Sequence, residues 1–118
     1  MANFIDAMDS ANYVTAELEK PMGIVFEENG PKEGGGIFIM DLKEDGIAAK
    51  EGTAAVGDQL VAVNGKKVYG MDFDDALGAI IASETEKTKL LFFRGPSDQF
   101  YGPTGASEEW LTEFLAES

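Results

Sequence analysis

Short apolar segments recur along the chain, and each is bounded by glycine, proline or charged residues. Segments of this length are typical of β-strands, whereas longer segments with a period near 3.6 residues are typical of helices. The pattern predicts strands over Tyr13–Glu19, Gly23–Glu28, Ile37–Leu42, Gln59–Val63, Lys66–Val68 and Thr88–Arg94. Asn64-Gly65 predicts a tight hairpin between two of these strands, because both residues tolerate positive φ.

One longer segment has helical periodicity. From Phe73 to Ile81, apolar residues fall at i, i+4, i+7 and i+8, which places them on one face of a helix. Asp72 is suited to be the N-cap of this helix. A shorter helical turn is predicted over Gly46–Lys50. Strands and short helices alternate irregularly, which indicates a small α+β domain: a partly open barrel or sandwich of five to six strands, capped by two helices.

Composition narrows the range of functions. The chain has 118 residues, with 22 acidic and 9 basic ones and a formal net charge of −13. Such a surface repels phosphate backbones, so we expect no nucleic-acid partner. Histidine and cysteine are absent, which excludes imidazole and thiolate chemistry. Adjacent acids such as Asp74-Asp75 point apart and make no ready catalytic pair, so we expect no enzyme activity and no cofactor. The stretch Asp41-Leu42-Lys43-Glu44-Asp45-Gly46 has lysine where an EF-hand needs its second ligand, so we expect no metal site. No apolar run is long enough to predict a membrane span.

The acidic residues divide the chain into three parts. Seven acids and no base lie in the flanks, which predicts an N-terminal extension over 1–11, a central domain over 12–94 and an acidic C-terminal extension over 95–118. Ser107 is suited to cap a short helix over about 107–116. The apolar stripe of this helix comprises Trp110, Leu111, Phe114 and Leu115. A helix this short is marginal alone, so it must dock, either on its own domain, which we favour, or on a partner.

Three local patterns occur in an order that resembles a PDZ domain over about residues 12–94. They are the loop Lys20-Pro21-Met22-Gly23-Ile24, the stretch Gly57-Asp58-Gln59-Leu60-Val61-Ala62-Val63-Asn64-Gly65, and the helix that begins near Asp72. The resemblance implies a peptide carboxylate-binding loop of Lys20, Met22, Gly23 and Ile24, in which the amides of the last three bind the carboxylate and Lys20 assists through water. It also implies a peptide groove of Ile24, Val25, Phe26, Phe73, Leu77 and Ile80, in which Ile24 and Phe26 face the ligand.

This resemblance predicts a protein-interaction module without catalytic activity. The apolar groove predicts a ligand that ends in an apolar residue, because a protein C-terminus would add as an extra strand beside the helix. Phe73 stands where some members of the family have histidine, so we expect an apolar residue rather than Ser or Thr at the ligand's third-last place. The alternative is a subunit of a larger assembly, held by both extensions and associated with a membrane complex only at its periphery.

A finer resemblance concerns Leu18 to Asn29, which look like the opening of PDZ domains in plastid proteins of plants and algae. Some of those proteins are associated with photosystem assembly at the thylakoid. The resemblance predicts a plastid location, in the stroma or at the thylakoid, with a transit peptide removed. The other location we consider is the cytoplasm.

Overall fold

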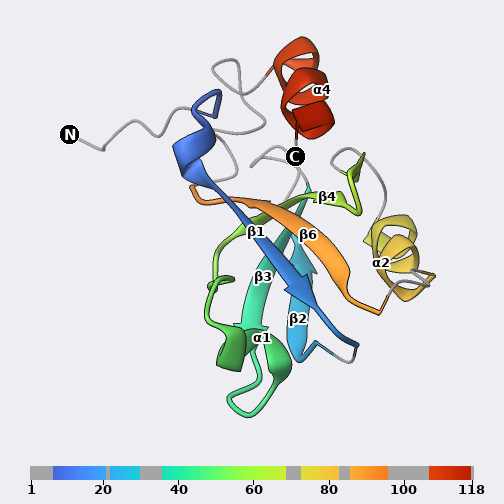
Figure 1. The fold of residues 1–118 in the computed structure, drawn as a ribbon. Coiled ribbons are helices and arrows are strands. Elements are labelled where there is room, and N and C mark those ends of the chain that lie inside the picture. Colours follow the sequence, from blue (N-terminus) through green and yellow to red (C-terminus); the bar gives the residue numbers. More distant parts are fainter. Residues whose placement is uncertain are drawn as a thin grey trace.

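The computed structural model describes residues 7–20, 22–29, 36–68, 73–82, 86–95 and 107–117. A 3₁₀ turn, η1 (Ser10–Asn12), precedes the first strand. The strands are β1 (Tyr13–Leu18), β2 (Ile24–Glu28), β3 (Ile37–Leu42), β4 (Gln59–Val63), β5 (Lys66–Lys67) and β6 (Thr88–Phe93). The helices are α1 (Ile47–Glu51), α2 (Phe73–Ile81) and α4 (Glu108–Glu117) (Figure 1).

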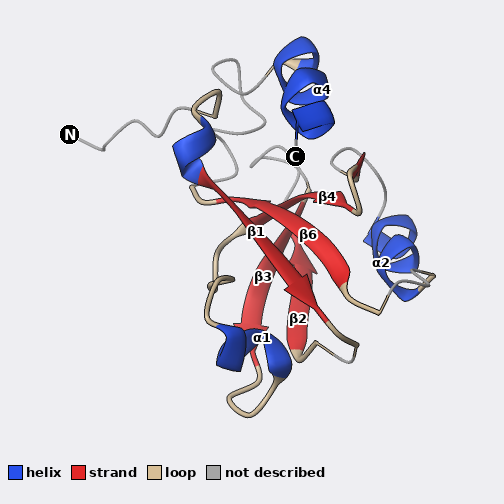
Figure 2. Ribbon diagram, viewed as in Figure 1, coloured by secondary structure: helices blue, strands red, loops and turns tan. Residues whose placement is uncertain are grey.

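The strands form one antiparallel six-stranded sheet (Figure 2). Their order is β1-β6-β4-β3-β2, and β5 pairs with β4 beside this path. The two ends of the order do not pair with each other, so the sheet stays open, with β2 at one edge and β1 at the other. The predicted partly open α+β fold with capping helices and a C-terminal helical extension is therefore confirmed.

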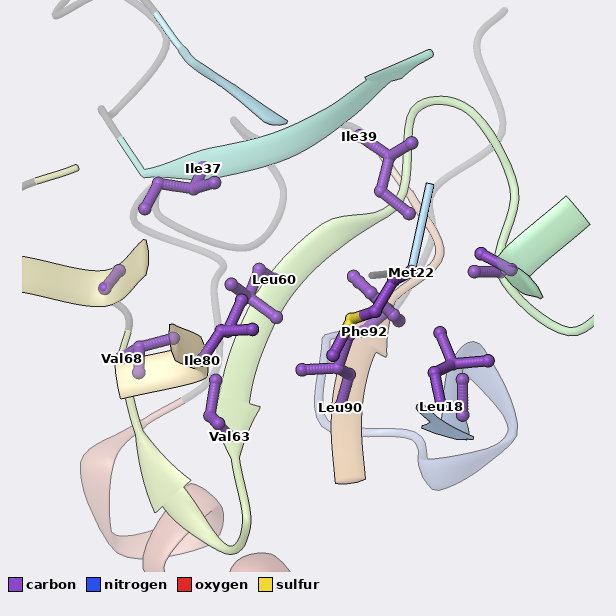
Figure 3. Close-up of a cluster of buried hydrophobic side chains, with 14 residues drawn as sticks. Leu18, Met22, Ile37, Ile39, Leu60, Val63, Val68, Ile80, Leu90 and Phe92 are labelled. Atoms are coloured by element: carbon purple, nitrogen blue, oxygen red, sulfur yellow. The ribbon is translucent and has the colours of Figure 1, made fainter. Parts of the chain in front are cut away.

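Alternation along the strands gives the sheet two apolar faces. Leu90 and Phe92 point to one face, whereas Leu91 and Phe93 point to the other. The first face carries the main core, to which Ile39 of β3 and Ile80 of α2 contribute (Figure 3). All five residues of β4 are buried, because both faces are covered at this strand.

The second face is covered by α4, the described helix of the C-terminal extension. Leu111 of α4 is 1% exposed and packs in a cluster with Tyr13, Val61 and Leu91 of the sheet. This places α4 near the start of β1 (Figure 1). The rest of the predicted stripe, Trp110, Phe114 and Leu115, packs against the same cluster. The stripe thus docks on its own domain, as we favoured. The partner-docking role also assigned to Trp110, Leu111, Phe114 and Leu115 stays a prediction.

Contacts between aromatic rings connect α4 to the sheet. The ring of Tyr13 lies 5.3 Å from that of Phe93, 5.5 Å from that of Trp110 and 4.9 Å from that of Phe114, measured between centroids. These separations are typical of favourable tilted pairs. The Tyr13 hydroxyl also donates a 2.7 Å hydrogen bond to the backbone carbonyl of Ala7. Tyr13 therefore links the segment before β1, the sheet and α4.

Most predicted elements are present; several strands are one residue shorter than predicted, and the helices predicted over 46–50 and about 107–116 lie one residue later. β1 ends at Leu18 and β6 at Phe93, one residue earlier than predicted in each case. The hairpin prediction is confirmed, since Asn64 and Gly65 have φ of 51° and 81°. The predicted N-cap at Asp72 and the loop residue Pro21 lie outside the described residues. Within the described part of the chain, no helix has the length and apolar character needed to cross a bilayer.

Candidate functional site

A groove of about 500 Å³ lies beside the edge strand β2 and the end of α2. Five apolar residues and Gly23 make up most of its lining, together with two lysines. The lining residues are Lys20, Met22, Gly23, Ile24, Phe26, Lys43, Ile80 and Ile81. Ile24 and Phe26 line it from alternate positions of β2, and Val25 between them is absent from the lining. The groove is therefore mainly apolar, with two positively charged side chains in its lining.

The backbone of β2 offers an open edge to this groove. The amide of Lys43 donates a 2.8 Å hydrogen bond to the carbonyl of Gly23, so that carbonyl points toward the β3 side. Backbone groups of successive residues in an antiparallel ladder point alternately to the two sides. The N–H and C=O of Ile24 therefore point away from β3. Among the described strands, none pairs with β2 on that side.

The loop before β2 has its carbonyls anchored on one side. The amide of Ala48 in α1 donates a 2.9 Å hydrogen bond to the carbonyl of Met22. Since a trans peptide group is planar, its N–H points opposite to its C=O, so the Gly23 N–H points away from α1. Gly23 has a φ of 77°, a conformation that side chains rarely permit. The loop can thus direct the amides of Gly23 and Ile24 toward one anion.

A second glycine holds this loop in place. A Cβ atom built on Gly23 would lie 2.9 Å from the Cα of Gly46, and one built on Gly46 would lie 3.0 Å from the Cα of Gly23. Neither position has room for a side chain unless the backbone shifts. The turn from Lys43 to Gly46, closed by a 2.9 Å hydrogen bond from the Gly46 amide to the Lys43 carbonyl, is thereby fixed against the loop.

The structure gives Lys20 a different contact from the one that the resemblance implied. Its ammonium donates hydrogen bonds to the backbone carbonyls of Ile80 at 3.3 Å and Ile81 at 2.9 Å. These carbonyls lie in the last turn of α2, where they have no partner within the helix. Lys20 lines the groove, but its charge is directed at the end of α2.

Of the remaining predicted site residues, one lines the groove and two pack against the core. Ile80 lines the groove although it is 7% exposed, whereas Phe73 and Leu77 are partly buried and pack against the main core. Sequence reasoning missed Lys43 and Ile81, which both line the groove. Ile81 is the last residue of the apolar face of the predicted helix, so the sequence pattern could have indicated that it lines the groove. Lys43 follows a strand that is distant in sequence from the loop, and the sequence holds no comparable signal for it.

The Gly57-Asp58 part of the motif has a structural role away from this groove. The buried carboxylate of Asp58 accepts hydrogen bonds from Nε and Nη2 of Arg94 at 3.0 and 2.8 Å, and from the amide of Ala55 at 2.9 Å. The hydrogen bond to Asp58 raises the pKa of Arg94 above its usual value. Arg94 also donates a 2.7 Å hydrogen bond to the carbonyl of Thr53, so the pair joins the end of β6 to the segment before β4.

Comparison with known proteins supports the assignment of the fold. Residues 38–94 match the family model described as PDZ domain. The chain is 42% identical over 77 residues to the membrane-associated guanylate kinase, WW and PDZ domain-containing protein 3 of Gallus gallus, which covers 64% of this chain and 7% of that protein. It is 35% identical over 81 residues to the InaD-like protein of Rattus norvegicus, covering 66% of this chain and 4% of that protein. The chain thus spans only a small part of these relatives.

Two solved structures share the fold. The third PDZ domain of INAD, solved in complex with a TRP channel tail, aligns with a TM-score of 0.61 and 28% identity, over 75% of this chain and 98% of that one. A Dlg PDZ domain of the choanoflagellate Monosiga brevicollis aligns with a TM-score of 0.61 and 21% identity, over 68% and 89% of the two chains. None of these four is named as a plastid protein, and the plastid location stays a prediction. The matched family model and the shared fold identify a PDZ domain in this chain.

Proposed function

We propose that this chain binds the C-terminal tails of partner proteins, without catalysis, by adding the tail as a strand to β2. The observation that carries the proposal is the open edge of β2 beside an apolar groove, at a loop whose glycine has a φ of 77°. The INAD domain, which shares the fold, was solved in complex with a TRP channel tail, and this supports the binding of a protein tail.

The tail would bind through its backbone, through its terminal carboxylate and through the side chain of its last residue. Its backbone would pair with the outward-pointing groups of β2, which supplies affinity with little dependence on sequence. Its carboxylate would accept hydrogen bonds from the amides of Gly23 and Ile24. Hydrogen bonds to a charged group contribute about 1.5–3 kcal/mol each, so the terminal carboxylate would contribute strongly to binding.

The side chains of the groove would select an apolar last residue. Met22, Ile24, Phe26, Ile80 and Ile81 line the space, and none of them offers a hydrogen bond to a polar side chain. A buried leucine or valine side chain gains about 1.5–3 kcal/mol from leaving water, which a polar residue would lose. Phe73, the first residue of α2, lacks the hydrogen-bonding group that a Ser or Thr ligand would need, so we propose an apolar residue at the third-last place as well.

A library of free C-terminal peptides, repeated with the hits amidated, tests this function. We expect selection of apolar residues at the last and third-last places, and a large loss of affinity on amidation. The variant Ile81→Glu tests the groove, because Ile81 is 73% exposed and tolerates the change. It places a negative charge beside the bound carboxylate, so we expect at least a tenfold loss of affinity, about 1.4 kcal/mol.

Val56→Glu is the matched control, since Val56 is 60% exposed and lies outside this groove. It adds the same charge and should leave binding unchanged. Binding that is indifferent to amidation, or an equal effect of the two variants, would contradict the proposed function. The extensions and the assembly role would then become the hypothesis to test.

A further inference from the structure

Two lysines line the groove, and their ammonium groups have different surroundings. Lys20 is bound to the carbonyls of Ile80 and Ile81, which form the negative end of the α2 dipole. A positive charge held there stabilises the helix end. The charge of Lys20 is thus largely engaged by the protein itself.

Lys43 contacts the carboxylate-binding loop through its backbone, and its Cβ atom lies close to Gly23. Its amide bonds the carbonyl of Gly23, and its Cβ lies 3.5 Å from the position that a Cβ on Gly23 would occupy. The contact of Gly23 with Gly46 fixes the turn that begins at Lys43. Within the residues that the structure describes, no carboxylate forms an ion pair with the Lys43 ammonium. This lysine therefore stands beside the loop with its charge available.

We propose that Lys43, rather than Lys20, supplies the positive charge that recognises the ligand's C-terminal carboxylate, and that Lys20 is a positioning residue for α2. This inference rests on the proposed function. The chain carries a net charge of −13, so an anionic tail is repelled at long range. A local cation on the loop side of the groove reduces this repulsion where the carboxylate binds. An exposed ion pair changes affinity by about twofold to fivefold.

A double-mutant cycle tests the assignment. The dissociation constants of one free-acid tail and its amidated form are measured by calorimetry for the natural chain and for Lys43→Met, Lys20→Met and Lys66→Met. Lys66 is exposed in β5 and lies outside the groove, so its variant controls for the change in net charge. We expect Lys43→Met to weaken the free acid about twofold to fivefold and to leave the amide unchanged. The loss should shrink at about 0.5 M salt, where charges are screened within a few ångströms.

Lys20→Met should instead lower the melting temperature and weaken the acid and the amide equally. Equal losses for acid and amide in Lys43→Met, or the same loss in Lys66→Met, would overturn the assignment. So would a loss specific to the free acid in Lys20→Met but not in Lys43→Met. If the natural chain binds no free tail or does not distinguish acid from amide, the proposed function fails, and the assignment of Lys43 fails with it.

Discussion

Leu111 fastens the C-terminal helix to the sheet, and its truncation tests whether that docking holds in solution. Leu111 is 1% exposed, between the β-sheet and the rest of α4. Replacing a fully buried leucine by alanine typically costs about 2–5 kcal/mol, from lost burial and the cavity left behind. α4 is held to the sheet by side-chain packing and can detach rather than leave a cavity. We therefore expect a loss near the lower limit, about 2–3 kcal/mol of unfolding free energy, for Leu111→Ala.

The assay uses a natural reporter. Trp110 is the chain's single tryptophan, and its ring stacks on Phe114 at 4.9 Å and lies 5.5 Å from Tyr13. Undocking would move it into water, so we expect a red shift of fluorescence in Leu111→Ala at denaturant concentrations where the sheet remains folded. Thr112→Ala is the control, because Thr112 is exposed on the same helix. A free-energy loss for Leu111→Ala below about 0.5 kcal/mol, the size of an ordinary surface change, would refute docking on the sheet.

Three other changes test separate contacts. Asp58→Asn removes the charge that Arg94 contacts. Because the Arg94 side chain is 47% exposed and water screens it, we expect the free energy of unfolding in urea to fall by only about 1–2 kcal/mol, with peptide affinity unchanged. Thr88→Val should raise the melting temperature, since the buried Thr88 hydroxyl has no hydrogen-bond partner in the described part of the chain and its replacement gains about 1 kcal/mol; a lower melting temperature would contradict this. Gly46→Ala should reduce both stability and tail binding, because its Cβ would lie 3.0 Å from the Gly23 backbone, whereas Gly78→Ala on the open side of α2 should add about 0.5–1 kcal/mol; equal effects of the two would refute the steric argument.

Local pattern was sufficient to predict most of the elements. The strands follow from short apolar runs bounded by glycine and charge, and α2 follows from the spacing between Phe73 and Ile81. The hairpin at Asn64-Gly65 needs only the preference of these two residues for positive φ, which the structure shows. Each of these features depends on neighbours within a few residues, so the sequence carries the information directly.

Only the tertiary structure shows which element packs against the apolar side of each helix or strand. The stripe that includes Leu111 predicted a helix that must dock, but only the fold shows that its surface is the second face of the sheet. Lys20 was expected at the carboxylate, yet its ammonium contacts carbonyls 60 and 61 residues away in sequence. The contact of Gly23 with Gly46 likewise joins two separate loops. Periodicity determines which side of an element is apolar, because that depends on its own geometry, whereas the partner of that side depends on how all the elements pack together.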